Sequence, residues 1–180
     1  MFSKLYYIHG YQSSPQGDKG ILFKEKLNAT AIKYRDVKPE KLMIADCLKS
    51  IKKTINNDKN VILIGSSLGG FLAANTAIYN TNIKKLILLN PAILPPETNI
   101  DEIQDLPKRI LKDMINERLF KDTIKSEIII IRGTKDEVVP DKWIYEFASS
   151  QEAIIKFLHD DHRFSKNLKK LPDIISNFLI

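Results

Sequence analysis

The stretch from Val61 to Gly70, VILIGSSLGG, constrains the fold of this chain more than any other. Four apolar residues that favour β-structure run directly into a Gly-x-Ser-x-Gly pattern, and the helix-compatible run FLAANTAIYN follows. A sharp turn between a buried strand and a buried helix strains its middle residue and raises that side chain clear of the sheet. The pattern therefore predicts a nucleophile elbow with Ser67 as the nucleophile.

The glycines on either side of Ser67 fit this interpretation. A Cβ at Gly65 or Gly69 would collide with the backbone of the neighbouring strand or helix. The backbone N–H of Leu68 is then expected to point at an oxyanion. A Gly/Ser-rich turn that merely joins a strand to a helix is the plainer alternative. A phosphate-binding loop fits less well, because no Lys-Ser or Lys-Thr pair closes the glycine run.

Length and composition indicate one globular domain over residues 1–180, with 43% hydrophobic residues to build a continuous core. The apolar runs are shorter than a membrane span, and the N-terminus lacks the pattern of a signal peptide. The one cysteine, Cys47, excludes an internal disulfide and fits a reducing compartment. We therefore expect a cytoplasmic protein in which Cys47 is a buried small hydrophobic residue.

The formal net charge of +6 raises the question of nucleic-acid binding. The lysines are spread along the chain among acidic residues, and there is no arginine-rich stripe or alternation of aromatic and basic residues. Solvated helix faces are therefore the favoured interpretation, and no nucleic-acid partner is expected. The charge can still attract anionic substrates over long range.

Short apolar runs alternate with helical patterns along the chain. The predicted strands are KLYYIHG (4–10), AIKYR (31–35), VILI (61–64), KKLILLNP (84–91), EIIIIRG (127–133) and AIIKFL (153–158). The predicted helices are 18–28, a helix that can start at Pro39 and carries Ile44, Leu48, Ile51 and Ile55 on one face, 71–80, 141–149 and 168–179. This order predicts an α/β fold with a mostly parallel, doubly wound six-stranded sheet and helices on both faces.

The segment of about 91–125 interrupts the alternation. Its apolar residues from Ile103 to Phe120 form a broad helical face with no strand between them. Connections in compact domains are usually short, so the segment is predicted to be a helical lid or a binding element. An ordinary crossover helix is the equal alternative. In the first case, Met114 and Ile115 are expected to line a substrate pocket.

A serine hydroxyl is a weak nucleophile, so an imidazole must take its proton and a carboxylate must orient that imidazole. Both groups are expected in loops at the carboxyl ends of parallel strands. The loop after EIIIIRG offers Asp136 as the carboxylate, with Glu137 and Asp141 as competitors.

The loop after AIIKFL offers two histidines, His159 and His162. His159 lies at the strand end, where a histidine is often a structural residue, whereas His162 lies further out and is preferred as the base. The spacing His159-x-x-His162 beside Asp160 and Asp161 also suggests a metal site. The only other histidine, His9, is expected on a different strand, and ligand sets usually include three or more such residues, so we expect no metal.

The His9-Gly10 pair ends the first predicted strand, and the loop after it is expected beside the elbow. In this architecture that loop supplies a second oxyanion donor, for which the backbone N–H of Tyr11 is the candidate. His9 itself is expected to brace the loop by hydrogen bonding.

Several motifs together resemble the small bacterial α/β-hydrolase esterases of the YqiA/YcfP type. They are YIHGYQSSPQG, GSSLGG, LNPAILP, GTKDEVVP and DHRF, and they extend over most of the chain. The resemblance implies an α/β-hydrolase fold, a Ser67–His162–Asp136 triad, and oxyanion N–H groups from Tyr11 and Leu68. It also implies activity on short acyl esters or acyl-CoA thioesters. The acidic pair Asp160-Asp161 departs from the small, glycine-containing loop expected there.

The sequence thus predicts a serine esterase that forms an acyl-enzyme, needs no cofactor, and acts on a small-molecule ester or thioester as a monomer or homodimer. A thioesterase or an amidase would use the same residues on another leaving group. A non-catalytic binding protein that keeps the hydrolase fold is the alternative from a different class.

Overall fold

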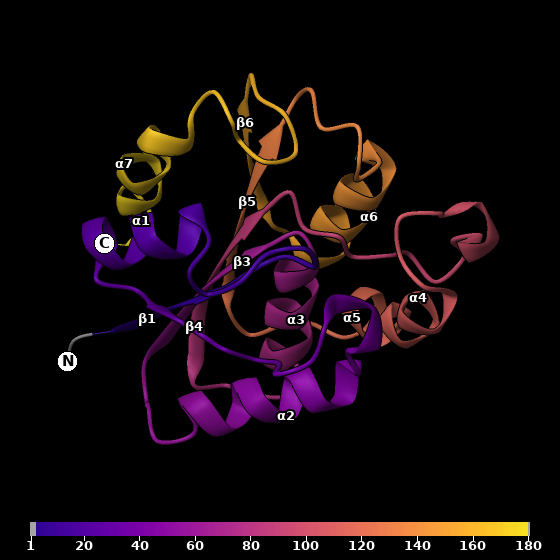
Figure 1. The fold of residues 1–180 in the computed structure, drawn as a ribbon, viewed down its shortest axis with the longest axis horizontal. Coiled ribbons are helices and arrows are strands. Elements are labelled where there is room, and N and C mark those ends of the chain that lie inside the picture. The colour runs from indigo at the N-terminus through magenta and orange to yellow at the C-terminus, as the bar shows by residue number, and fades with distance from the viewer. Residues whose placement is uncertain (1–2, 180) are drawn as a thin grey trace.

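The computed structural model describes residues 3–179 of the chain and contains one six-stranded sheet. Its order is β2-β1-β3-β4-β5-β6, and every neighbouring pair is parallel, as the sequence predicts (Figure 1). The strands are β1 (Lys4–Ile8), β2 (Thr30–Ala31), β3 (Val61–Ser66), β4 (Ile83–Leu89), β5 (Glu127–Gly133) and β6 (Ile154–Leu158).

Helices cover both faces of the sheet (Figure 1). One face carries α1 (Asp18–Leu27) and α7 (Leu171–Ser176). The other carries α2 (Ile44–Ile55), α3 (Leu68–Ala77), α4 (Lys108–Met114), α5 (Arg118–Lys121) and α6 (Asp141–Gln151). Short 3-10 turns lie at Pro39–Lys41, Ile100–Glu102 and Leu168–Lys170.

Successive strand residues pack into opposite layers of the core because side chains alternate across a strand. Tyr6 and Ile8 of β1 join the large layer with α2 and α3, whereas Tyr7 between them joins the small layer with α1 and α7. All six residues of β3 are buried. Continuous apolar runs such as VILI are therefore typical of the centre of this sheet, which is covered on both faces.

The second predicted strand is much shorter than AIKYR suggests. Only Thr30 and Ala31 pair with β1, and the N–H of Ile32 adds one more bond to the Tyr7 carbonyl oxygen at 2.8 Å. The chain then leaves the edge of the sheet. The buried side chain of Tyr34 reaches the end of β1, where its hydroxyl donates to the carbonyl oxygen of His9 at 3.2 Å.

The apolar spacing of the second helix is correctly predicted, but its start is not. Pro39 opens a 3-10 turn, and α2 begins only at Ile44. Ile51 and Ile55 are fully or almost fully buried in the core. Cys47 is buried on the same helix as a free cysteine, as predicted, and burial raises the pKa of its thiol to about 11.

The segment of residues 91–125 is divided into short pieces rather than one helical face. It contains the 3-10 turn at Ile100–Glu102, then α4 after Pro107, then α5, and no strand. Four of its side chains are completely buried in the core: Ile110, Leu111, Met114 and Leu119. Arg109 also donates from Nη2 to the carbonyl oxygen of Leu42 at 2.9 Å. Helix α4 is therefore held at the amino end of α2, whereas α5 lies against α6.

Among residues 3–179, no helix combines the length and the apolar character that a membrane crossing requires.

Candidate active site

Ser67 occupies the turn between β3 and α3 with φ of 54° and ψ of −119°. A positive φ is strained for any residue with a side chain. Two backbone bonds hold Ser67 there, because its N–H donates to the Leu89 carbonyl oxygen at 3.0 Å and its carbonyl oxygen accepts from the N–H of Ala92 at 3.1 Å. This strand–turn–helix geometry is that of a nucleophile elbow.

The flanking glycines are required by close backbone packing, as the sequence predicts. A Cβ at Gly65 would lie 2.4 Å from the carbonyl oxygen of Gly69. A Cβ at Gly69 would lie 2.0 Å from the carbonyl oxygen of Ile8. The amino end of α3 therefore lies directly against the end of β1, which brings the loop after β1 next to the elbow.

The two serines of the motif lie in different surroundings. Ser66 is buried and hydrogen-bonds to the hydroxyl of Tyr7, in the core layer of α1 and α7. Ser67 is partly exposed and lies beside Gly10, where a Cβ would be 4.0 Å from the Ser67 Oγ. Leu68 is the first residue of α3, so its N–H has no acceptor within the helix.

Asp136 and His162 lie in hydrogen-bond contact at the carboxyl ends of β5 and β6. Nδ1 of His162 lies 2.9 Å from Oδ2 of Asp136, whose side chain is completely buried. The other carboxylate oxygen, Oδ1, accepts from the N–H groups of Val138 and Val139 at 2.8 and 3.1 Å. Burial raises the pKa of Asp136, but the hydrogen bond and charge of His162 and these two N–H groups together hold it below its usual value.

This contact assigns the proton-bearing nitrogen of His162. Since the carboxylate of Asp136 accepts, Nδ1 carries the hydrogen, and Nε2 keeps the lone pair that can accept a proton. His159 is exposed, and its ring lies 3.5 Å from the hydroxyl of Thr134. Asp136 thus pairs with His162, the histidine preferred on sequence grounds.

The two competing carboxylates are placed differently. Glu137 is exposed. Asp141 accepts from Nε and Nη2 of Arg132 at 2.9 and 2.7 Å, and its side chain is 62% exposed.

Arg132 is a residue of the site that the sequence interpretation missed. It is buried, and its Nη1 donates to the same Oδ2 of Asp136 that His162 contacts. A cation directly after the apolar run IIII, residues 128–131, was the available signal. A buried guanidinium needs carboxylate partners, and Asp136 and Asp141 supply them.

Asn90 is the second missed residue, and it joins the ends of three strands. It follows β4, is completely buried and has φ of 42°. Its Oδ1 accepts from the N–H of Gly133 at 2.8 Å, and its Nδ2 donates to the carbonyl oxygen of His162 at 3.1 Å. The neighbouring carbonyl of Leu89 binds Ser67, so one short segment holds both the elbow and the histidine loop.

The acidic pair before His162 shapes its own loop. The buried Asp160 carboxylate accepts from the N–H groups of Asp161, Lys166 and Asn167 at 2.9, 3.1 and 2.7 Å. Burial raises the pKa of Asp160, but these bonds hold it below its usual value. The departure from a glycine-containing loop is therefore compensated by side-chain bonds to the loop backbone. Within residues 3–179, no three His, Cys, Asp or Glu side chains gather as metal ligands would.

His9 makes the bracing contacts that the sequence predicts. Its Nδ1 donates to the carbonyl oxygen of Gly10 at 2.9 Å, and its ring stacks on Tyr34 with centroids 4.3 Å apart. Burial lowers its pKa to about 4. The imidazole is therefore neutral at physiological pH and holds the loop that contains Tyr11, the predicted oxyanion donor.

The predicted substrate residues occupy the carboxyl end of α4. Met114 is the last residue of that helix and is completely buried, whereas the next residue, Ile115, is partly exposed. Their contact with a substrate stays a prediction.

The family model that matches this chain is described as Uncharacterised protein family (UPF0227), and it matches residues 4–179. The chain belongs to this family. It is the YqiA/YcfP type that the sequence motifs resemble. A search of curated proteins gives no match.

Solved structures with the same arrangement are α/β hydrolases. Est1E from Butyrivibrio proteoclasticus with bound ferulic acid has a TM-score of 0.77 at 20% identity, covering 98% of this chain and 88% of that one. Mouse alpha/beta hydrolase domain-containing protein 10 has a TM-score of 0.73 at 20% identity, covering 98% and 89%. A lipase-esterase related protein from Clostridium acetobutylicum has a TM-score of 0.73 at 16% identity, covering 98% and 94%. The fold is therefore that of an α/β hydrolase.

The lowered pKa of His9 predicts a dependence of stability on pH. Between pH 6.5, the usual pKa, and about pH 4, the unfolded chain binds a proton that the folded protein excludes. The free energy of unfolding should therefore fall by up to about 3 kcal/mol as the pH decreases through this window. Urea unfolding of wild type and His9→Gln across pH 4–7 measures the effect, which the substitution should reduce.

His159→Gln is the matched control for His9, because it replaces an exposed histidine by the same residue. If the free energy of unfolding changed equally with pH in wild type and His9→Gln, the pH dependence could not be assigned to His9.

Proposed function

We propose that this protein is a serine hydrolase that cleaves short-chain carboxylic esters, with Ser67 as nucleophile, His162 as base and Asp136 as the orienting acid. The observation that carries the proposal is the 2.9 Å contact between His162 Nδ1 and the buried Asp136. The contact lies at the carboxyl ends of β5 and β6, in the same parallel sheet whose strand β3 ends at a serine with the elbow conformation. Chain order is nucleophile, acid, base, which is typical of α/β hydrolases.

The reaction would proceed in two halves. The Ser67 oxygen attacks the ester carbonyl while Nε2 of His162 takes its proton, and the carbonyl oxygen becomes an oxyanion. The N–H groups of Tyr11 and Leu68 stabilise that charge, where one donor can contribute about 3–4 kcal/mol. The C–O bond to the alcohol then breaks as His162 returns the proton to the leaving oxygen. Water repeats the same steps on the acyl-enzyme and releases the acid.

An ester substrate is favoured over a thioester or an amide only by similarity to other proteins. Est1E was solved with ferulic acid, and the Clostridium protein is described as lipase-esterase related. A thioesterase or an amidase would use the same residues, and comparing esters, acyl-CoA thioesters and amides separates the three. A non-catalytic binding protein would lack an activated serine.

We also propose that the chain works as one domain in the cytoplasm, as a monomer or homodimer, with the 91–125 segment as part of the substrate site. The single cysteine supports the compartment, and the continuous sheet supports the single domain. Size-exclusion chromatography with light scattering measures the oligomeric state directly.

Ser67→Ala should abolish both ester hydrolysis and labelling by a fluorophosphonate probe, because the attacking oxygen is removed. Ser66→Ala is the matched control, because Ser66 is buried against Tyr7 in the other core layer. Hydrolysis of p-nitrophenyl acetate and gel-based labelling measure the two effects, and circular dichroism verifies folding. Labelling that persists in Ser67→Ala and disappears in Ser66→Ala would mean that the elbow register is wrong.

His162→Ala should lower kcat by about 1,000-fold or more, because Ser67 then keeps its proton at neutral pH. His159→Ala should keep most of the activity, since that ring is exposed and lies 3.5 Å from the Thr134 hydroxyl rather than against the carboxylate of Asp136. Steady-state kinetics on one ester compare the variants. The assignment fails if a folded His159→Ala is inactive while His162→Ala is fully active.

Met114 and Ile115 are the proposed wall of the acyl pocket, because a short-chain site needs an apolar surface. Ile115→Ala should shift the preference among acetyl, butyryl and octanoyl esters more than it changes the rate on acetyl esters. Met114→Ala should also lower the free energy of unfolding by about 2–5 kcal/mol, because it empties a buried site. An unchanged chain-length profile in Ile115→Ala would leave this segment a crossover connection.

A further inference from the structure

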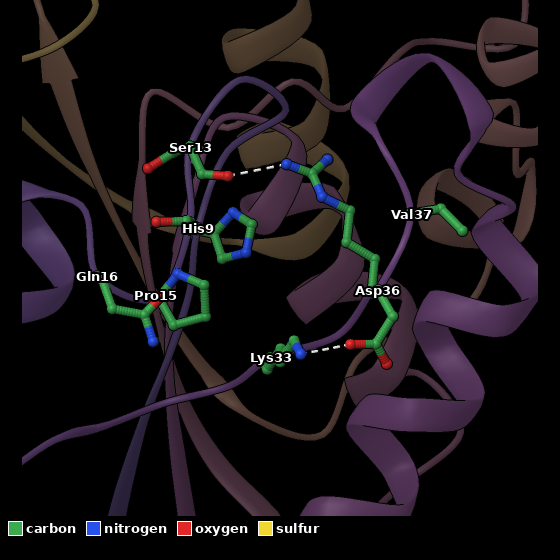
Figure 2. A pocket seen from close by; sticks show the side chains of 9 residues that line it. His9, Ser13, Pro15, Gln16, Lys33, Asp36 and Val37 are labelled. Atoms are coloured by element: carbon green, nitrogen blue, oxygen red, sulfur yellow. Dashed lines mark hydrogen bonds and ion pairs between the residues drawn. The ribbon is translucent and has the colours of Figure 1, made fainter.

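A hollow of about 280 Å³ lies between the loop after β1 and the segment that follows β2. Figure 2 shows the side chains of His9, Ser13 and Gln16 on one side and those of Lys33 and Asp36 on the other. Arg35 belongs to the same lining. No step of the proposed reaction uses this hollow.

The guanidinium of Arg35 has a donor that lacks an acceptor. Its Nη2 donates to the carbonyl oxygen of Ser13 at 2.8 Å. Its Nη1 is buried and, within residues 3–179, has no hydrogen-bond partner. A buried donor without a partner typically destabilises a protein by about 1–3 kcal/mol. This atom is covered by protein and is out of reach of a ligand, so an anion in the hollow must be bound by other atoms of the guanidinium, whose Cζ lies over the Tyr34 ring at 5.5 Å from its centroid.

The charges around the hollow favour an anion. Lys33 forms an ion pair with Asp36, so their charges cancel. Arg35 forms no ion pair with a carboxylate among the described residues. His9 is neutral at physiological pH, because burial lowers its pKa to about 4. One uncompensated positive charge therefore remains, on a group whose planar donors match carboxylate and phosphate oxygens.

The hollow and the proposed nucleophile lie beside the same short loop. His9 lines the hollow, and the next residue, Gly10, lies against Ser67. The charge of Arg35 also acts on Tyr11, the proposed oxyanion donor: burial and Glu40 raise the pKa of its phenol, and Arg35 opposes that rise. A ligand in the hollow would thus be close to the reacting ester.

We propose that this hollow binds a negatively charged group of the substrate, a carboxylate or a phosphate, and that Arg35 recognises it. The inference rests on the proposed function, which it narrows from short-chain esters in general to esters that carry an anionic group. Arg35 is then a specificity-determining residue, and the positive charge of its guanidinium attracts the anion.

The test compares anionic and neutral esters of similar size. The anionic probes are monomethyl succinate, monomethyl glutarate and monomethyl adipate, and the neutral probes are methyl butyrate and methyl valerate. Acid release is followed by titration at constant pH. The wild type should show a kcat/KM at least tenfold higher for the best anionic ester, and added salt should reduce that ratio. Glutarate and inorganic phosphate, added as competitors, distinguish a carboxylate site from a phosphate site.

Variants assign the preference to Arg35. Arg35→Gln should lower the anionic-to-neutral ratio of kcat/KM about tenfold, whereas Arg35→Lys, which keeps the charge, should retain part of it. Arg118→Gln is the matched control, because it removes the same charge from an exposed arginine outside the lining of the hollow. It should leave the ratio unchanged.

The possible failures are distinguishable. A wild type that hydrolyses none of the esters and resists the fluorophosphonate probe overturns the proposed function. A wild type that hydrolyses neutral and anionic esters equally overturns this inference alone. Equal ratios in wild type and Arg35→Gln also overturn it. If Arg35→Gln does not fold, the inference is tested by competition of glutarate or phosphate with methyl butyrate in the wild type. An absence of inhibition at 10-fold excess of the anion over the ester overturns the anion site.

Discussion

The positive φ of Ser67 is the constraint on which the rest of the site depends. A non-glycine residue in that conformation is strained by about 1–3 kcal/mol, and it persists only where the surroundings enforce it. Here the carbonyl of Leu89 and the N–H of Ala92 fix the Ser67 backbone from β4 and the residues after it. Gly69 permits α3 to lie against the end of β1. The elbow therefore fixes the distance between the central strand and the loop that begins at His9.

A buried network of polar side chains connects the end of β4 to the ends of β5 and β6. The side-chain oxygen of Asn90 accepts from the N–H of Gly133 at the end of β5, and its side-chain nitrogen donates to the carbonyl oxygen of His162 beyond β6. Arg132 binds Asp136 and also lies 3.4 Å from the Asn90 side-chain oxygen. Asn90 and Arg132 both bind residues of other strands or of the loops that follow them, so these loops are held against one another. Such satisfied networks rigidify a site.

The sequence predicts those features that local patterns determine. Six apolar runs, the glycines beside Ser67 and the order of the predicted triad all follow from periodicity and motif spacing. Two kinds of feature do not follow. The end of β2 depends on the bond from Tyr34 to the end of β1, and the placement of α4 depends on the bond from Arg109 to the Leu42 carbonyl oxygen. Both are tertiary contacts. Arg132 and Asn90 appear ordinary in sequence because their partners are distant.

The charge balance around Asp136 explains how a buried arginine is compatible with the proposed role of His162 as a base. Arg132 and Asp136 alone would form a neutral pair, which would do little to stabilise an imidazolium on His162. Asp141 binds the same guanidinium, so the three groups together carry one negative charge. The proton that His162 gains in the proposed reaction then brings the cluster to neutrality. Because Asp141 is largely exposed, solvent screens its share, and the buried Asp136 provides most of the stabilisation.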